Sequence, residues 1–345
     1  MEILQNSHKD VGLVKPLSLI AAQFLAECVG YCPTEIRALP GLAAELGLGS
    51  LWAKLEVDRF GLNSFKILGA KWALHQYLAT QPDRRIRRLI TATDGNHGRA
   101  VAQLGRQERL STTIYVPEHT STSIIRQIGS EGADVIIVPG TYDDAVDAAY
   151  EGTASLGEDA LLLSDTSPSG SDSVAEWIIQ GYETIFAEAG MQLSTISNTG
   201  PDIVLLQIGV GGLAAAASRY FRRHGGLSPA LIGVESVAAA AAMRSVESGS
   251  LVRVEALPRT VMSGINAGLL SATAWPDLKY GFDWFMTIED SWCHKALDAL
   301  SQEGIFAGPT GAAGMAGILA LAQWRQNPTV KNKNVLVIVT EGNRI

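Results

Sequence analysis

Short apolar runs rich in β-branched residues recur along the chain and predict buried strands. The runs that match are Leu51–Leu55, Leu89–Ala92, Thr113–Val116, Val135–Val138, Ile203–Ile208, Leu231–Val234 and Val335–Val339. Longer stretches with helical spacing of apolar positions lie between them, at Ser64–Ala79, His97–Arg106, Thr122–Glu131, Asp143–Leu156, Ala175–Glu188, Leu213–His224 and Gly311–Trp324. Strands that alternate with helices in this way are typical of βαβ units and a parallel sheet.

This alternation predicts a two-lobed α/β fold with mostly parallel, twisted sheets flanked by helices. Residues 86–158 contain a compact strand–helix series of their own. We therefore expect a small domain at 86–158, inserted into a large domain made of residues 1–85 and 159–345. The apolar stretch Leu17–Val29 is too short to span a bilayer and too far from the start for a secretory signal, so it predicts a short buried helix.

Composition and charge narrow the class of protein. With 47% hydrophobic and 18% charged residues and a net charge of −8, the chain has the composition of a compact globular enzyme. The cluster Arg84–Arg88 is either a nucleic-acid patch or a solvated helix end, and the lack of a wider basic face favours the second. The three cysteines match no zinc pattern and suggest reduced thiols. We expect a cytoplasmic enzyme that binds no nucleic acid, membrane or metal.

Lys66 lies near the start of a predicted helix, directly after Asn63, Ser64 and Phe65. Asn and Ser are good helix caps, so Lys66 falls close to the positive end of the helix dipole. That position and partial burial disfavour an ammonium group, and a neutral amine can form an imine. The alternative is a surface lysine on an amphipathic helix.

A second strand–helix junction carries the polar run from Thr91 to Gly98. Ligands of open α/β sheets bind beyond the carboxyl ends of the strands, and Gly95 and Gly98 allow a close approach of the backbone. Asp94 and Asn96 are therefore candidate ligand-binding residues, although Asp94 could equally be a simple helix cap. His97 is either a base or a side chain that packs under the loop.

The third junction is glycine-rich, and its residues Gly209, Val210, Gly211, Gly212 and Leu213 follow a predicted strand and open a helix. Consecutive backbone amides at a helix N-terminus can bind a phosphate. A dinucleotide site is a weaker alternative, with Glu235 about twenty positions further on as its acidic residue. Thr340, at the end of the last strand, either offers a hydroxyl to a ligand or belongs to a fraying edge strand.

Taken in order, these segments resemble the fold-type II family of enzymes that use pyridoxal 5′-phosphate (PLP), which includes threonine dehydratase and the tryptophan synthase β subunit. The matching segments are Pro33-Thr34, Ser64-Phe65-Lys66, Gly95-Asn96-His97-Gly98, Gly132–Val135, Gly209–Leu213 and Thr340-Glu341-Gly342-Asn343. Within the family the chain is most similar to diaminopropionate ammonia-lyases, whose hallmarks are matched by Arg59–Lys66, Asp94–Arg99, Asp165-Thr166, Trp177–Tyr182 and Thr340-Glu341-Gly342.

The resemblance implies a role for each segment. Lys66 would hold PLP as a Schiff base, Asn96 would bond its phenolic oxygen, and the Gly209–Leu213 amides would cradle its phosphate. The hydroxyl of Thr340 would face the pyridine nitrogen. Asp94 and Asp165 match the two carboxylates that remove Cα protons from opposite faces of a small amino-acid substrate. A homodimer is also implied by the family alone.

Two departures from the ammonia-lyase pattern leave the outcome of the reaction open. The stretch after Gly264 continues as Ile265–Ser271 without the expected Cys-Gly-Glu-Pro-Asn-like segment, and Asp165 is followed by a serine-rich loop in which its side chain could simply cap a turn. The expected activity is a carbon–nitrogen lyase that eliminates ammonia from 2,3-diaminopropionate to give pyruvate. The alternatives are a β-replacement synthase, a serine or threonine dehydratase-like enzyme, and a non-catalytic binding or dinucleotide-binding protein.

Overall fold

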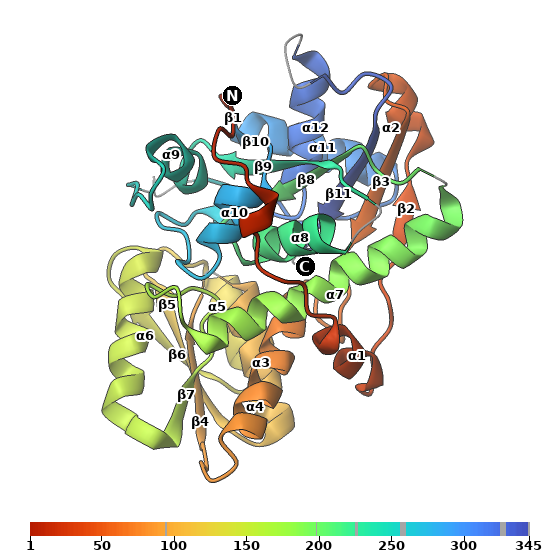
Figure 1. Cartoon of the computed structure of the whole chain (residues 1–345). Helices are drawn as coiled ribbons and strands as arrows, with labels where there is room; N and C mark the ends of the chain where they lie inside the picture. Colours follow the sequence, from red (N-terminus) through yellow and green to blue (C-terminus); the bar gives the residue numbers. More distant parts are fainter. Residues whose placement is uncertain (94, 198, 225–226, 256–259, 325–328, 344–345) are drawn as a thin grey trace.

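Two sheets organise the chain, one in each of two lobes (Figure 1). The computed structural model describes residues 1–93, 95–197, 199–224, 227–255, 260–324 and 329–343. The larger sheet has seven strands in the order β1-β10-β9-β8-β11-β3-β2, and the smaller has four in the order β6-β5-β4-β7. The predicted α/β fold with mostly parallel sheets is confirmed.

The seven-stranded sheet is parallel in its centre and antiparallel only at its two edges. Its strands are β1 (Ile3–Gln5), β2 (Ile36–Ala38), β3 (Ser50–Leu55), β8 (Ile203–Gln207), β9 (Ala230–Ser236), β10 (Trp284–Ile288) and β11 (Asn334–Val339). The smaller sheet is parallel throughout, with strands β4 (Arg88–Ala92), β5 (Ser111–Pro117), β6 (Asp134–Val138) and β7 (Ala160–Leu162).

Helices cover both faces of the large sheet and connect it to the small one. The α-helices are α1 (Ile20–Glu27), α2 (Pro40–Glu45), α3 (Lys66–Thr80), α4 (Asn96–Glu108), α5 (Thr122–Ser130), α6 (Tyr142–Leu156), α7 (Ser173–Ile196), α8 (Gly212–Arg223), α9 (Ala241–Ser248), α10 (Trp275–Gly281), α11 (Asp290–Gln302) and α12 (Ala313–Gln323). Short 3₁₀ helices lie at η1 (Val11–Leu13), η2 (Gly157–Asp159) and η3 (Ser263–Ile265).

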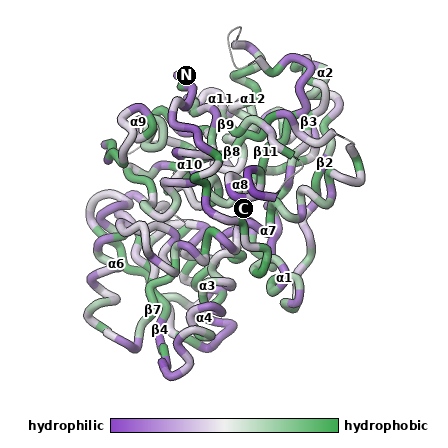
Figure 2. The backbone as a smooth tube through the Cα atoms, in the orientation of Figure 1, coloured by the Kyte–Doolittle hydropathy of each residue, from purple (hydrophilic) through white to green (hydrophobic). Residues whose placement is uncertain are grey.

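The alternation of side chains along each strand builds two cores, one on each face of the large sheet. In β11, Leu336 and Ile338 pack into the core that contains α3, α7 and α8, whereas Val335, Val337 and Val339 pack into the core with α11 and α12. The first core continues to the small sheet through buried residues of β4 and β5. Hydrophobic positions accordingly gather in the interior of both lobes (Figure 2).

All seven predicted strands are present, whereas β1, β2, β7 and β10 are not among the strands predicted from the sequence. The expectation of a short buried helix at Leu17–Val29 needs correction, and one of the two alternatives for Thr340, a fraying edge strand, is excluded. The helix predicted at Leu17–Val29 is α1, of which only Ala21 and Leu25 are buried, while Val29 is 99% exposed. The last strand, β11, is not an edge strand, since it pairs with β3 on one side and β8 on the other.

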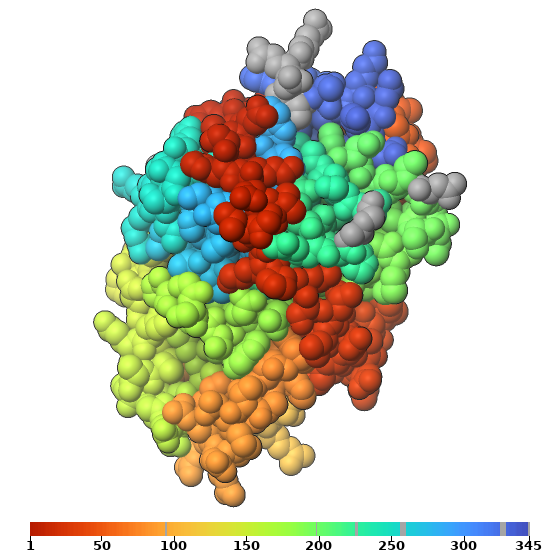
Figure 3. All heavy atoms as spheres, in the orientation of Figure 1, coloured from red at the N-terminus to blue at the C-terminus, as the bar shows by residue number. Residues whose placement is uncertain are grey.

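The N-terminal segment crosses the outer face of the large lobe, as the space-filling view shows in red (Figure 3). The Asn6 amide donates to the backbone oxygens of Lys279 and Phe282, both at 2.8 Å, and Arg223 donates to the carbonyl of Val14. Three strands of the small sheet, β4, β5 and β6, lie within residues 86–158, the part of the chain predicted as an inserted domain, whereas the fourth, β7, lies just after it. The bounds of this domain stay a prediction. None of the described helices is long and apolar enough to cross a membrane.

Candidate active site

Lys66 is the first residue of α3, and its amine points to a carboxylate. Its Nζ lies 2.5 Å from Oδ2 of Asp165, which belongs to the loop after β7. The amine and the carboxylate thus form an ion pair in the site. The expected capping by Asn63 and Ser64 is wrong. The helix begins at Lys66 without a side-chain cap, because Asn63 and Ser64 instead pair with the C-terminal segment at Gly342 and Glu341.

The position of Lys66 depends on a close crossing of α3 and α7. A Cβ atom on Gly181 would lie 2.6 Å from the backbone oxygen of Leu68, and one on Gly69 would lie 2.7 Å from the side chains of Ile178 and Tyr182. Only glycines at both positions allow the two helices to approach this closely. The first turn of α3, with Lys66, is therefore held against a long buried helix.

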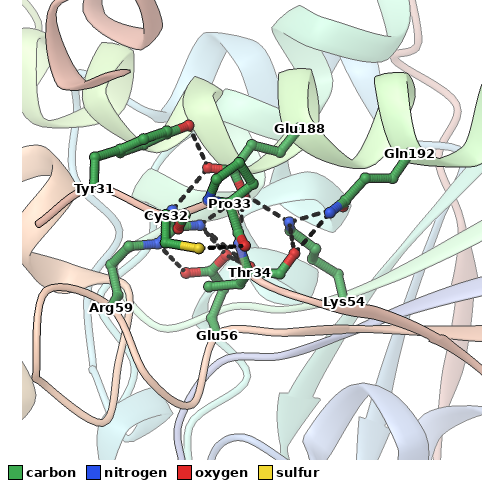
Figure 4. Close-up of polar contacts among 9 residues, drawn as sticks. All are labelled: Tyr31, Cys32, Pro33, Thr34, Lys54, Glu56, Arg59, Glu188 and Gln192. Carbon is green, nitrogen blue, oxygen red and sulfur yellow. Dashed lines mark hydrogen bonds and ion pairs between the residues drawn. The ribbon is translucent and has the colours of Figure 1, made fainter. Parts of the chain in front are cut away.

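A buried ion-pair network fixes the connection that leads from β3 to Lys66 (Figure 4). Arg59 contacts both oxygens of Glu56 and both oxygens of Glu188 of α7, at 2.6–3.0 Å. Lys54 adds a second cation, 2.7 Å from Glu188. Burial alone would raise the pKa of Glu188, but hydrogen bonds and charge from Arg59 and Lys54 lower it. Each side chain of these four is at most 1% exposed, so the network joins β3, α7 and the segment between β3 and α3 away from bulk solvent.

We expect Arg59→Met to lower the free energy of unfolding by about 3–5 kcal/mol, because it leaves two buried carboxylates with one cation. Arg37→Met provides the matched control. Arg37 pairs with Glu35 at the surface, where both side chains are at least 33% exposed, so its loss should cost at most about 1 kcal/mol. Urea unfolding of both variants measures the difference. Equal destabilisation by the two substitutions would contradict the structural role of the network.

Asp165 is 6% exposed and contacts three neighbours in the site. Besides Lys66, its carboxylate lies 3.5 Å from the hydroxyl of Tyr142 and 3.9 Å from Nδ1 of His97. Burial alone would raise the pKa of Asp165, but the charge and the hydrogen bond of Lys66 lower it to about 2. The carboxylate is therefore ionised throughout the neutral range.

The serine-rich loop does not use Asp165 as a cap. The hydroxyl of Ser164 accepts the backbone N–H of Thr166, and the hydroxyl of Ser167 accepts that of Ser169. The cap of the following helix α7 is Asp172, which accepts the N–H of Ala175 at 3.0 Å. The carboxylate of Asp165 is thus left to face the pocket.

The N-terminus of α4 brings Asn96 and His97 to the same pocket. The Asn96 amide donates to the carboxylate of Glu341, which follows β11. His97 packs under the loop, since it is 3% exposed and its Nε2 hydrogen-bonds the carbonyl of Leu163 at 2.8 Å. Burial lowers the pKa of His97, so it is neutral at neutral pH and Nε2 carries the proton. Asp94, the other candidate of this junction, lies outside the described residues.

The glycine-rich loop joins β8 to α8, and Gly211 has a φ of +98°, which favours glycine. The first N–H groups of α8 have no acceptor within the helix, and together with the helix dipole they form an anion site. Glu235, considered above as the acidic residue of a dinucleotide site, instead accepts the backbone N–H groups of Ala242 and Met243. Burial raises its pKa to about 8.

Thr340 lies directly after the interior strand β11 and is 3% exposed. Its hydroxyl accepts a hydrogen bond of 2.8 Å from the side chain of Gln207, at the end of β8. Sequence reasoning missed both Gln207 and Glu341 as site residues. Gln207 is a polar residue in an apolar strand that leads into the glycine-rich loop, and Glu341 directly follows Thr340, so each lies next to a predicted ligand segment.

The described candidates converge on one pocket between the two lobes. Its lining includes Lys66, Asn96, Asp165, Gly209, Val210, Gly211, Gly212, Leu213 and Thr340, together with Tyr142, Tyr182 and the segment 264–267. These groups fit PLP chemically: an amine for its aldehyde, helix N-terminal amides for its phosphate, and amide and hydroxyl groups for its ring.

Comparisons with known proteins agree with this fit. The model of the pyridoxal-phosphate dependent enzyme family matches residues 29–341. A diaminopropionate ammonia-lyase of Salmonella typhimurium is 31% identical over 90% of this chain and 85% of its own length. The crystal structure of diaminopropionate ammonia lyase from Escherichia coli, in complex with an aminoacrylate–PLP azomethine reaction intermediate, superimposes with a TM-score of 0.90 at 29% identity, covering 99% of this chain and 94% of that one.

An L-threonine dehydratase of Corynebacterium glutamicum is more distant, at 26% identity over 89% of this chain and 67% of its own length. The family match covers most of the chain, from a point before β2 to Glu341, the residue after Thr340. The chain therefore belongs to the family of pyridoxal-phosphate dependent enzymes.

Proposed function

We propose that this chain catalyses the α,β-elimination of ammonia from 2,3-diaminopropionate, or from a similar β-substituted amino acid, to give pyruvate. The observation that carries the proposal is the contact between Lys66 and Asp165. It places an amine that can hold the cofactor beside a buried carboxylate that can hold a proton. The similarity to diaminopropionate ammonia-lyases over nearly the whole chain supports the same substrate.

In this proposal the cofactor supplies an electron sink for the bonds at Cα of a bound amino acid. Lys66 holds it covalently, and the amides of Gly209–Leu213 bind its phosphate. Asn96, oriented by Glu341, hydrogen-bonds the phenolic oxygen. The hydroxyl of Thr340 faces the pyridine nitrogen from the end of β11.

Asp165 takes the Cα proton on one face of the substrate, and Asp94 takes it on the other. The low pKa of Asp165 results from the charge of Lys66. Burial on its own would raise the pKa of this carboxylate, which would make it a stronger base for the Cα proton. A pair of bases on opposite faces would let one enzyme use both enantiomers.

A β-replacement reaction is the second candidate, favoured by the segment Ile265–Ser271, which departs from the lyase pattern. Asn266 and Ala267 of this segment line the pocket, where they would contact a substrate or a second nucleophile. The dehydratase-like alternative would share the same lining.

The two candidates differ in the fate of the carbon skeleton, so incubation with O-acylated serine and a thiol separates them. Elimination gives pyruvate with or without the thiol. Replacement gives a new amino acid, which forms only when the thiol is present, and little pyruvate. Pyruvate that depends on the thiol, or is absent, would argue against the lyase.

Three further features belong to the proposal and rest on the family resemblance and the sequence. They are a homodimer, a cytoplasmic location, and a small domain at residues 86–158 that carries Asn96 toward the large domain.

A further inference from the structure

The side chain of Gln207 lies under the pocket, at the carboxyl end of β8, and is 4% exposed. Its Nε2 is surrounded by four acceptors. Three are backbone oxygens, of Thr310 at 3.1 Å, Gly311 at 3.4 Å and Ile338 at 3.0 Å. The fourth is the hydroxyl oxygen of Thr340 at 2.8 Å.

These acceptors fix the orientation of the amide. If the side chain were flipped, Oε1 would face three carbonyl oxygens, and Nε2 would lose every acceptor it has. In the observed orientation the nitrogen of the Gln207 amide is hydrogen-bonded, whereas its oxygen, Oε1, has no hydrogen-bond partner among the described residues. A buried amide that leaves its oxygen unpaired carries a free-energy cost, so the contacts of Nε2 must outweigh it. Gln207 therefore presents a donor, and not an acceptor, to Thr340.

A hydroxyl that accepts a hydrogen bond from one side still has one proton to donate. Thr340 lines the pocket, so its proton is available in that direction. The nearby carboxylate of Glu341 is already used by the Asn96 amide and by the backbone N–H of Thr310. A group in the pocket that meets Thr340 must then act as the acceptor.

We infer that Gln207 is a positioning residue that makes Thr340 a hydrogen-bond donor to the pyridine nitrogen of the cofactor. This inference rests on the placement of the cofactor in the proposed function. A nitrogen that accepts a hydrogen bond must keep its lone pair, so it stays unprotonated and withdraws electrons less strongly than a pyridinium. Without Gln207 the hydroxyl could rotate, and its oxygen could then accept a hydrogen bond from a protonated pyridine nitrogen.

The test is the ¹⁵N chemical shift of the pyridine nitrogen in protein loaded with ¹⁵N-labelled PLP. We expect the unprotonated position in the unmodified protein and a displacement toward the protonated position in Gln207→Met, which keeps a similar volume without donors. Thr340→Asp marks the protonated position, since a carboxylate pairs with a pyridinium. Gln180→Met is the matched control, because the Gln180 amide bonds Trp72 and does not line the pocket.

Each outcome decides one claim. A protonated nitrogen in the unmodified protein would overturn the inference even if Gln207→Met does not fold. An unchanged shift in a folded Gln207→Met protein would overturn it as well. Borohydride reduction followed by mass spectrometry reports separately whether the cofactor is bound to Lys66. Failure of the unmodified protein to take up the cofactor there would overturn the proposed function, and the inference with it.

Discussion

Lys66→Ala should abolish the activity of this enzyme. We expect turnover to fall by more than about 10⁴-fold, because the substitution removes both the covalent attachment of the cofactor and the proton carrier nearest to Asp165. The visible absorbance that arises from cofactor attached to a lysine should disappear. Absorbance spectra and assays of pyruvate formation measure the two effects.

Lys71→Ala is the control for this substitution. Lys71 lies on the same helix, where its amine donates to the side chain of Gln107 at 3.4 Å and lies 5.5 Å from the ring centre of Phe60, neither of them in the pocket. Its removal should change neither absorbance nor turnover. An absorbance band or measurable turnover that survives in Lys66→Ala would show that another residue holds the cofactor.

Asp165→Asn should produce the second largest effect, and an asymmetric one. The amide keeps the size of the side chain but cannot accept a Cα proton, so we expect turnover of one enantiomer of diaminopropionate to fall by about 10²–10⁴-fold. The other enantiomer, whose Cα proton faces Asp94 in our proposal, should lose much less. The measurement is kcat/KM for each enantiomer separately.

Asp172→Asn tests whether this loss is specific to the pocket. Asp172 lies in the same loop, but its carboxylate caps α7, and Asn is an equally good cap. Both enantiomers should react with this variant as with the unmodified protein. A parallel loss of both enantiomers in Asp165→Asn would contradict a role for Asp165 on one face of the substrate.

The parts of the site that the sequence predicts are those carried by local patterns. Lys66 and the Gly209–Leu213 loop each lie where a helix begins. The start of a helix can be recognised in the sequence from the spacing of hydrophobic residues and from the position of glycines. The alternation along the chain likewise predicts the seven strands with continuous apolar runs. Each motif alone is a weak indication, but their order along the chain matches one family. This resemblance is confirmed by the match at residues 29–341.

The parts that the sequence does not predict depend on contacts between distant segments. Gln207 and Thr340 are neighbours because β8 and β11 pair in the sheet. Glu341 reaches Asn96 because the C-terminal segment folds back beside the start of α4. The same segment occupies Asn63 and Ser64, which explains why their local preference for capping was overridden.

The central claim is the elimination reaction on diaminopropionate, and its stoichiometry tests it most directly. Loss of one amino group by elimination and of the other by hydrolysis should give one pyruvate and two ammonia per substrate consumed. We predict this ratio for both the D and the L enantiomer, measured with purified, cofactor-loaded protein by coupled assays of the two products. If neither enantiomer yields pyruvate while the cofactor remains bound to Lys66, the substrate assignment is wrong.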